Sequence, residues 1–135
     1  MIDVILISHG TFAVGLREAA EMIMGDQEQL TVLGLYPGET KEVFAEKLER
    51  VIDSCSSPGN VLVLADLQGG TPYNVAIMMV LKRGITCIAG ANLAMLLEVL
   101  SARDESGMEE LVSLAVETGG KGIVDSISLQ KRTDI

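Results

Sequence analysis

The chain has 135 residues, of which 48% are hydrophobic and only 3% aromatic, and its formal net charge at pH 7 is -9. This length predicts one domain, covering residues 1–135, whose core is large enough to be stable without disulfides or metals. The acidic charge argues against nucleic acid as a partner, because a phosphate backbone repels an acidic surface.

Cys55 and Cys87 are too few for a disulfide framework, and both lie in apolar stretches. We therefore expect reduced cysteines in a cytoplasmic protein. One histidine and two distant cysteines do not form a zinc ligand set, so no metal is expected. The N-terminus has no basic segment and no apolar run approaches the roughly 18 residues of a membrane span, so we expect neither secretion nor membrane insertion.

The hydrophobic pattern alternates strands and helices along the chain. The expected strands cover residues 4–7, 30–35, 61–65 and 85–89. The expected helices cover residues 12–23, 41–52, 72–82, 93–102 and 106–118. Apolar runs without alternation, such as residues 4–7, are typical of strands covered on both faces. This order predicts a three-layer, doubly wound α/β fold with a parallel sheet in the strand order 2-1-3-4.

Several residues are expected to end these helices. Gly25 follows the first helix as a C-cap, Thr40 and Asn92 precede two others as N-caps, and Ser106 with Glu109 fits a capping box. Beyond about residue 121 the pattern changes, because apolar residues 123, 127 and 129 alternate with polar ones. Such alternation predicts an edge strand with one buried face.

His9 is the one histidine of the chain, and it follows the first buried strand. In the expected strand order the first and third strands are neighbours, so Asp66, which follows the third strand, would lie beside His9. A carboxylate that holds one ring nitrogen leaves the other free as a nucleophile. Taken alone, each residue has a simpler interpretation, with His9 as a solvated histidine and Asp66 as a turn residue.

The segment Gly69-Gly70-Thr71-Pro72 follows Asp66 and begins the third helix, with Thr71 as the expected N-cap. The free amides of a helix start bind anions such as a phosphoryl group. We therefore expect Gly70 and Thr71 on one side, and Gly10 and Thr11 on the other, to line a phosphoryl site around His9. The sequence contains no Walker A motif, kinase glycine loop or carboxylate cluster for magnesium, so we expect no nucleotide or other cofactor and a protein as the phosphoryl donor.

Three segments, Ser8–Gly10, Asp66–Asn74 and Gly90–Leu96, resemble the mannose-family enzyme IIA component of the bacterial phosphoenolpyruvate-dependent sugar phosphotransferase system. The resemblance covers essentially the whole chain. It implies a phosphotransferase component in which His9 is phosphorylated through Nε2, Asp66 holds Nδ1, and Thr71 brings its hydroxyl near the phosphoryl group. A small departure is Ala94, where the family often has proline.

The resemblance also implies partners. The donor would be the phosphocarrier protein HPr, and the acceptor a histidine on a IIB component that links the chain to a membrane sugar permease. The family suggests a homodimer in which the C-terminal strand, about residues 123–129, pairs with the partner subunit's sheet. Because no Ala/Pro-rich linker precedes the last residue, we expect a free-standing IIA component rather than a IIA–IIB fusion.

Three other functions stay open on sequence alone. The chain could be a regulatory phosphoacceptor domain, the phosphotransfer subunit of a dihydroxyacetone kinase, or a flavodoxin-like module that binds an anion without turnover. The transported sugar is not encoded in any residue discussed above.

Overall fold

The computed structural model describes residues 1–133 of the chain. One parallel sheet has the strand order β2-β1-β3-β4, which confirms the predicted fold class and order. The strands are β1 (Asp3–His9), β2 (Leu30–Leu35), β3 (Val61–Ala65) and β4 (Thr86–Ala89). The helices are α1 (Phe12–Met24), α2 (Lys41–Ser54), α3 (Thr71–Arg83), α4 (Leu93–Ala102), α5 (Met108–Lys121) and α6 (Ser126–Thr133), with a short 3-10 turn η1 (Pro58–Asn60). No helix within residues 1–133 is long and apolar enough to cross a membrane.

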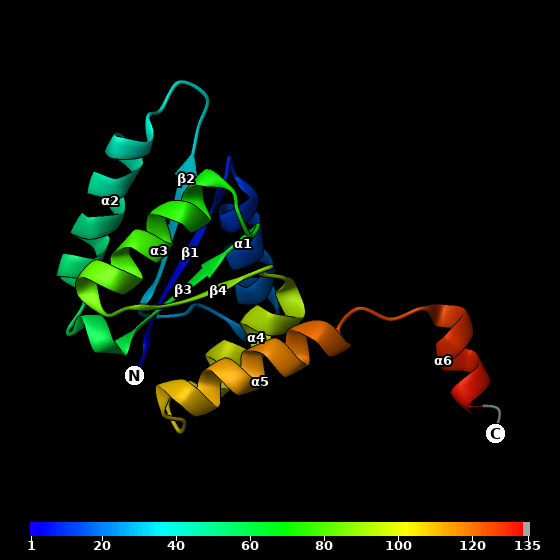
Figure 1. The fold of residues 1–135 in the computed structure, drawn as a ribbon. Helices are drawn as coiled ribbons and strands as arrows, with labels where there is room; N and C mark the ends of the chain where they lie inside the picture. The colour runs from blue at the N-terminus through cyan, green and yellow to red at the C-terminus, as the bar shows by residue number, and fades with distance from the viewer. Residues whose placement is uncertain (134–135) are drawn as a thin grey trace.

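Helices cover both faces of the sheet (Figure 1). Residues from α1, α4 and α5 form one buried cluster with one face of the strands, and residues from α2 and α3 form a second cluster with the other face. The buried apolar side chains of the strands are divided between these two clusters, so the sheet is the middle of three layers.

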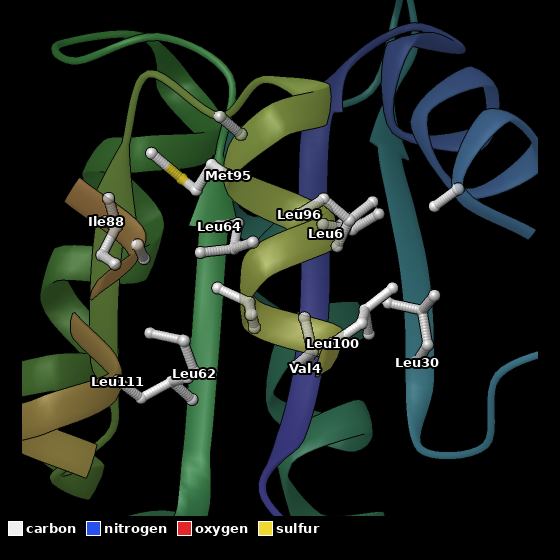
Figure 2. Close-up of a cluster of buried hydrophobic side chains, with 14 of the residues drawn as sticks. Val4, Leu6, Leu30, Leu62, Leu64, Ile88, Met95, Leu96, Leu100 and Leu111 are labelled. Atoms are coloured by element: carbon white, nitrogen blue, oxygen red, sulfur yellow. The ribbon is translucent and has the colours of Figure 1, made fainter. Parts of the chain in front are cut away.

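The alternation of side chains along β1 explains its continuous apolar sequence. Val4 and Leu6 lie in the first cluster, whereas Ile5 and Ile7 lie in the second. Figure 2 shows Val4 and Leu6 facing the apolar side chains of α4. Because both faces are covered, every residue from Val4 to Ile7 is buried, and each full burial stabilises the fold by about 1.5–3 kcal/mol.

Three predicted caps are confirmed. The Gly25 amide donates to the Glu21 carbonyl at the end of α1. The Thr40 hydroxyl accepts from the Val43 amide at 3.2 Å, at the start of α2. At the start of α4 the Asn92 side chain accepts from the Met95 amide at 2.9 Å.

Two helix starts differ from the prediction by one residue. The capping box of Ser106 and Glu109 does not form, because the N-cap of α5 is Gly107. At α3 the N-cap is Gly70, and Thr71 is the first helical residue. Glycine is tolerated at an N-cap, where the backbone is extended, although it offers no side-chain acceptor.

The predicted C-terminal edge strand is wrong in this structure, because residues 126–133 form helix α6. The Asp125 carboxylate accepts from the Ile127 amide at 3.0 Å and from the Ser128 hydroxyl at 2.7 Å, so Asp125 caps this helix. The alternation of apolar residues favoured a strand in the prediction and outweighed Asp125, whose residue type is common at helix N-caps. Figure 1 shows α6 projecting away from the rest of the chain. Residues 134 and 135 of the predicted tail lie outside the described residues.

Arg103, at the end of α4, is almost fully buried. Its guanidinium donates to the backbone carbonyls of Ile2 (3.2 Å), Gln29 (2.9 Å) and Glu28, which lie at the starts of β1 and β2. One side chain therefore ties α4 to the amino ends of two strands. It is a second donor to the Gln29 carbonyl, which also accepts from the Val4 amide at 3.0 Å.

Replacing Arg103 with methionine should lower the free energy of unfolding by about 2–4 kcal/mol, because the buried guanidinium no longer donates to the carbonyls of Ile2, Glu28 and Gln29. Urea denaturation monitored by circular dichroism measures this change. Arg50→Met on the exposed side of α2 is the matched control, with an expected effect within about 0.5 kcal/mol. Equal stability of the two variants would contradict the role assigned to Arg103.

Candidate functional site

The site is built where β1 and β3 end side by side. His9 is the last residue of β1, and Asp66 directly follows β3. The two strands are parallel neighbours, and the Asp66 amide donates to the Ile7 carbonyl at 3.2 Å, which extends the ladder by one bond. Parallel strands present their carboxyl ends at one edge of a sheet, so the two side chains are brought together there.

One carboxylate oxygen of Asp66 holds His9 at two points. Asp66 Oδ2 accepts from the His9 backbone amide at 2.9 Å and lies 2.8 Å from His9 Nδ1. The predicted contact between these side chains is therefore confirmed. Because an ionised carboxylate only accepts hydrogen bonds, Nδ1 carries the ring proton and the lone pair of Nε2 is available. The His9 side chain is 49% exposed and that of Asp66 only 13%.

The second oxygen of the same carboxylate is buried. Asp66 Oδ1 has no hydrogen-bond partner among the described residues. An unsatisfied buried acceptor costs about 1–3 kcal/mol, a cost that is typical of functional sites rather than of plain structural turns. The carboxylate is thus held out of solvent with its charge beside the imidazole, where it can stabilise positive charge on the ring.

The two glycines predicted to bind a phosphoryl group have amides that already form hydrogen bonds. The Gly10 amide donates to the Leu35 carbonyl at 2.8 Å, and the Gly70 amide donates to the Leu67 carbonyl at 3.2 Å. Gly10 also has a φ of +52°, which permits the turn between His9 and α1. Their role in phosphoryl binding stays a prediction.

Ser8 positions this turn. Its side chain is fully buried, and its hydroxyl accepts from the Ala13 amide at 2.8 Å. Ser8 therefore caps α1 from within β1. Thr11, the formal N-cap, makes no side-chain capping bond and is exposed. The Thr11 hydroxyl is consequently not used to cap α1, and its place at the rim around His9 stays a prediction.

The start of α3 lies beside the imidazole and has unused donors. A Cβ built on Gly70 would lie 2.7 Å from His9 Cε1, which places the ring directly against the helix N-cap. Within residues 1–133 the amides of Thr71 and Tyr73 have no acceptor, and Pro72 between them has no N–H. Free amides at a helix start attract anions. The same described residues contain no group of three or more His, Cys, Asp or Glu side chains that could hold a metal ion.

A mainly apolar groove of about 480 Å³ lies next to His9. It is lined by His9, Gly10, Leu35, Tyr36, Pro37, Gly38 and Glu39. A hydrogen bond from the Lys47 ammonium lowers the pKa of Glu39 below its ordinary value, and a hydrogen bond from the Tyr36 amide adds a smaller effect in the same direction. Glu39 is therefore ionised and fixed at the edge of the groove.

Large apolar side chains around the site are exposed. Phe12 at the start of α1 is 50% exposed, Tyr36 is 43% exposed and Leu67 is 59% exposed. Each lies next to a site residue in the chain or lines the groove. Exposed apolar side chains gathered around a polar centre are typical of protein interaction surfaces.

A family model described as the PTS system fructose IIA component, EIIA-man, matches residues 3–116. The chain belongs to this family. It is 40% identical over 124 residues to the PTS system mannose-specific EIIAB component of Escherichia coli strain K12, a match that covers 90% of the chain and 38% of that relative's length. It is also 35% identical over 114 residues to the PTS system fructose-specific EIIA component of Bacillus subtilis, covering 84% of the chain and 78% of the relative.

Solved structures agree with this membership. The EIIA component from Streptococcus agalactiae superposes with a TM-score of 0.88 at 30% identity, covering 95% of this chain and 99% of the other. The resemblance inferred from the His9 and Asp66 segments is therefore confirmed, and the chain is a IIA component of the mannose/fructose/sorbose class of the sugar phosphotransferase system.

Replacing Asp66 with alanine should shift the His9 tautomer, because the acceptor that holds the proton on Nδ1 is removed. Nitrogen-15 NMR of the imidazole measures the tautomer directly, and the chain contains a single histidine to report it. We expect the Nδ1–H form in the wild type and a loss of that preference in the variant. An unchanged tautomer would mean that the 2.8 Å contact does not control the ring.

Proposed function

We propose that the protein is a phosphohistidine carrier, which accepts a phosphoryl group from phospho-HPr on His9 and passes it to a IIB component in sugar uptake. The observation that supports this proposal is the bond between His9 Nδ1 and Asp66 Oδ2, which leaves Nε2 as the free nucleophile of a half-exposed ring. Membership of the IIA family of the sugar phosphotransferase system gives the class of donor and acceptor.

In the proposed first step the Nε2 lone pair attacks the phosphorus atom held by the donor's phosphohistidine. A new N–P bond forms on His9 as the donor's N–P bond breaks, and that electron pair returns to the donor imidazole. The proton on Nδ1 stays in its bond to Asp66. The second step repeats this exchange with a histidine of the IIB component as the nucleophile. Each step needs mainly positioning and charge stabilisation.

The surrounding residues have separate roles in this proposal. Asp66 orients the ring and stabilises the positive charge that the imidazole acquires when Nε2 is phosphorylated. At the start of α3, the free backbone amides and the Thr71 hydroxyl donate hydrogen bonds to the phosphoryl oxygens. Thr11 contributes from the opposite rim, because its hydroxyl is not used to cap α1.

The protein partners would dock over the exposed apolar side chains around His9. Phe12, Tyr36 and Leu67 supply the contact surface, and burying them against a partner excludes water from the phosphoryl group. A cytoplasmic location belongs to the same proposal.

We also propose a homodimer held by the C-terminal segment. Ile123, Val124 and Ile127 are 80%, 59% and 64% exposed, a large apolar surface for a segment that projects from the rest of the chain. Exposed apolar side chains on a projecting segment form a surface through which two copies of the chain can associate.

Incubation with phosphoenolpyruvate, enzyme I and HPr should place one acid-labile, base-stable phosphoryl group on the wild-type chain. His9→Ala should take no label, and Asp66→Ala should label at least about tenfold more slowly while retaining the fold, since it loses the orientation of the ring and the carboxylate charge beside it. Radiolabelled phosphate retained after gel filtration measures the transfer. Equal labelling of wild type and His9→Ala would rule out the carrier function.

A chain ending at Gly122 should sediment as a monomer, whereas the full chain should sediment as a dimer of the 14.4 kDa protein. This truncation leaves α5 complete and removes the exposed segment. Analytical ultracentrifugation measures the mass, and circular dichroism checks that the truncated chain keeps its helix content. A truncated chain that stays dimeric would show that another surface joins the subunits.

A further inference from the structure

The imidazole of His9 contacts two residues of one loop. Asp66 at the start of the loop holds Nδ1, and Gly70 at its end lies against Cε1 and Nε2. A Cβ on Gly70 would lie 2.7 Å from His9 Cε1 and 3.3 Å from Nε2. The first separation is far below van der Waals contact. The observed position of the ring therefore exists because residue 70 has no side chain.

We propose that Gly70 is a positioning residue, whose missing Cβ allows the His9 ring to lie against the start of α3 with Nε2 beside the free amides. The inference rests on the proposed carrier function for its effect on phosphoryl transfer. The effect on the ring itself follows from the contacts alone. Gly70 thereby acts through His9 and needs no contact of its own with the phosphoryl group.

The backbone at Gly70 does not itself require glycine. Its φ of -75° and ψ of 163° are ordinary extended values that alanine adopts without strain. This separates Gly70 from Gly69, whose φ is +83°. A substitution at residue 70 therefore tests the space occupied by the imidazole rather than the conformation of the loop.

The loop is fixed more firmly than the ring. The Gly70 amide donates to the Leu67 carbonyl at 3.2 Å, and the Asn74 amide donates to the Gly70 carbonyl at 2.9 Å. The Asn74 side chain donates to the Gly69 carbonyl at 3.1 Å. The His9 ring, by contrast, is the far end of a half-exposed side chain. A methyl group at residue 70 should consequently displace the imidazole and break its bond to Asp66, while the loop stays in place.

The chain offers a matched control at Gly107. Gly107 is also a helix N-cap, with a φ of -72° and a ψ of 166°, and a Cβ there would meet nothing within 4 Å. Gly107→Ala and Gly70→Ala thus make the same chemical change at the same type of position. They differ in whether an imidazole occupies the space.

The test measures both alanine variants in three ways. Thermal unfolding should give midpoints within about 3 °C of each other, because both lose only an N-cap glycine. Nitrogen-15 NMR should show the Nδ1–H form of His9 in the wild type and Gly107→Ala, and its loss in Gly70→Ala. Phosphorylation by phospho-HPr should proceed at the wild-type rate in Gly107→Ala and about 10- to 100-fold more slowly in Gly70→Ala, through kcat rather than KM.

Each other result overturns the inference. A midpoint of Gly70→Ala far below that of Gly107→Ala would mean that the methyl group displaces the loop and not the ring. An unchanged Nδ1–H signal, or an unchanged rate after the signal is lost, would show that Gly70 does not position His9 for transfer. If the wild type accepts no phosphoryl group, the carrier function fails, whereas the NMR comparison still decides whether Gly70 sets the ring.

Discussion

One carboxylate oxygen organises the functional edge of this protein. Asp66 Oδ2 binds both the backbone amide and the ring of His9, so it fixes where β1 ends and how the imidazole is turned. This arrangement depends on β1 and β3 being parallel neighbours, and hence on the order of the whole sheet. The crossovers, the two cores and the caps at the helix ends all serve to hold two strand ends side by side.

Among residues 1–133, a buried carboxylate oxygen without a partner lies at each end of the sheet, Asp3 Oδ2 at the amino ends of the strands and Asp66 Oδ1 at the carboxyl ends, but the two ends differ in their other polar groups. At the amino ends, Arg103 satisfies backbone carbonyls and locks α4 to the strands. At the carboxyl ends, Asp66 Oδ1 is left without a partner, and donors at the start of α3 are unused among the described residues. The hydrogen bonds of Arg103 and the two apolar cores stabilise the fold enough to offset the unpaired polar groups at the carboxyl ends of the strands. A phosphoryl group would need such unpaired groups to bind.

The sequence predicted most of this arrangement because its main elements are fixed by strong, local patterns. Continuous apolar runs identified buried strands, and their order identified the neighbours of β1, so the meeting of His9 and Asp66 could be deduced before any coordinates. The C-terminal helix was missed because alternating apolar residues outweighed the cap at Asp125. The roles of Ser8 and Gly70 could not be read from sequence, since both depend on three-dimensional distances: a hydroxyl reaching across a turn to Ala13, and a ring lying against a backbone atom.

The placement of the His9 ring has a consequence for the order of events. Asp66 holds Nδ1 and Gly70 lies against Cε1, so Nε2 is the one ring nitrogen left for both partners. In the proposed carrier, donor and acceptor would therefore compete for one docking place, and no complex of all three proteins would form. Such a carrier follows ping-pong kinetics, in which an excess of the unphosphorylated donor slows delivery to the acceptor by occupying the same surface.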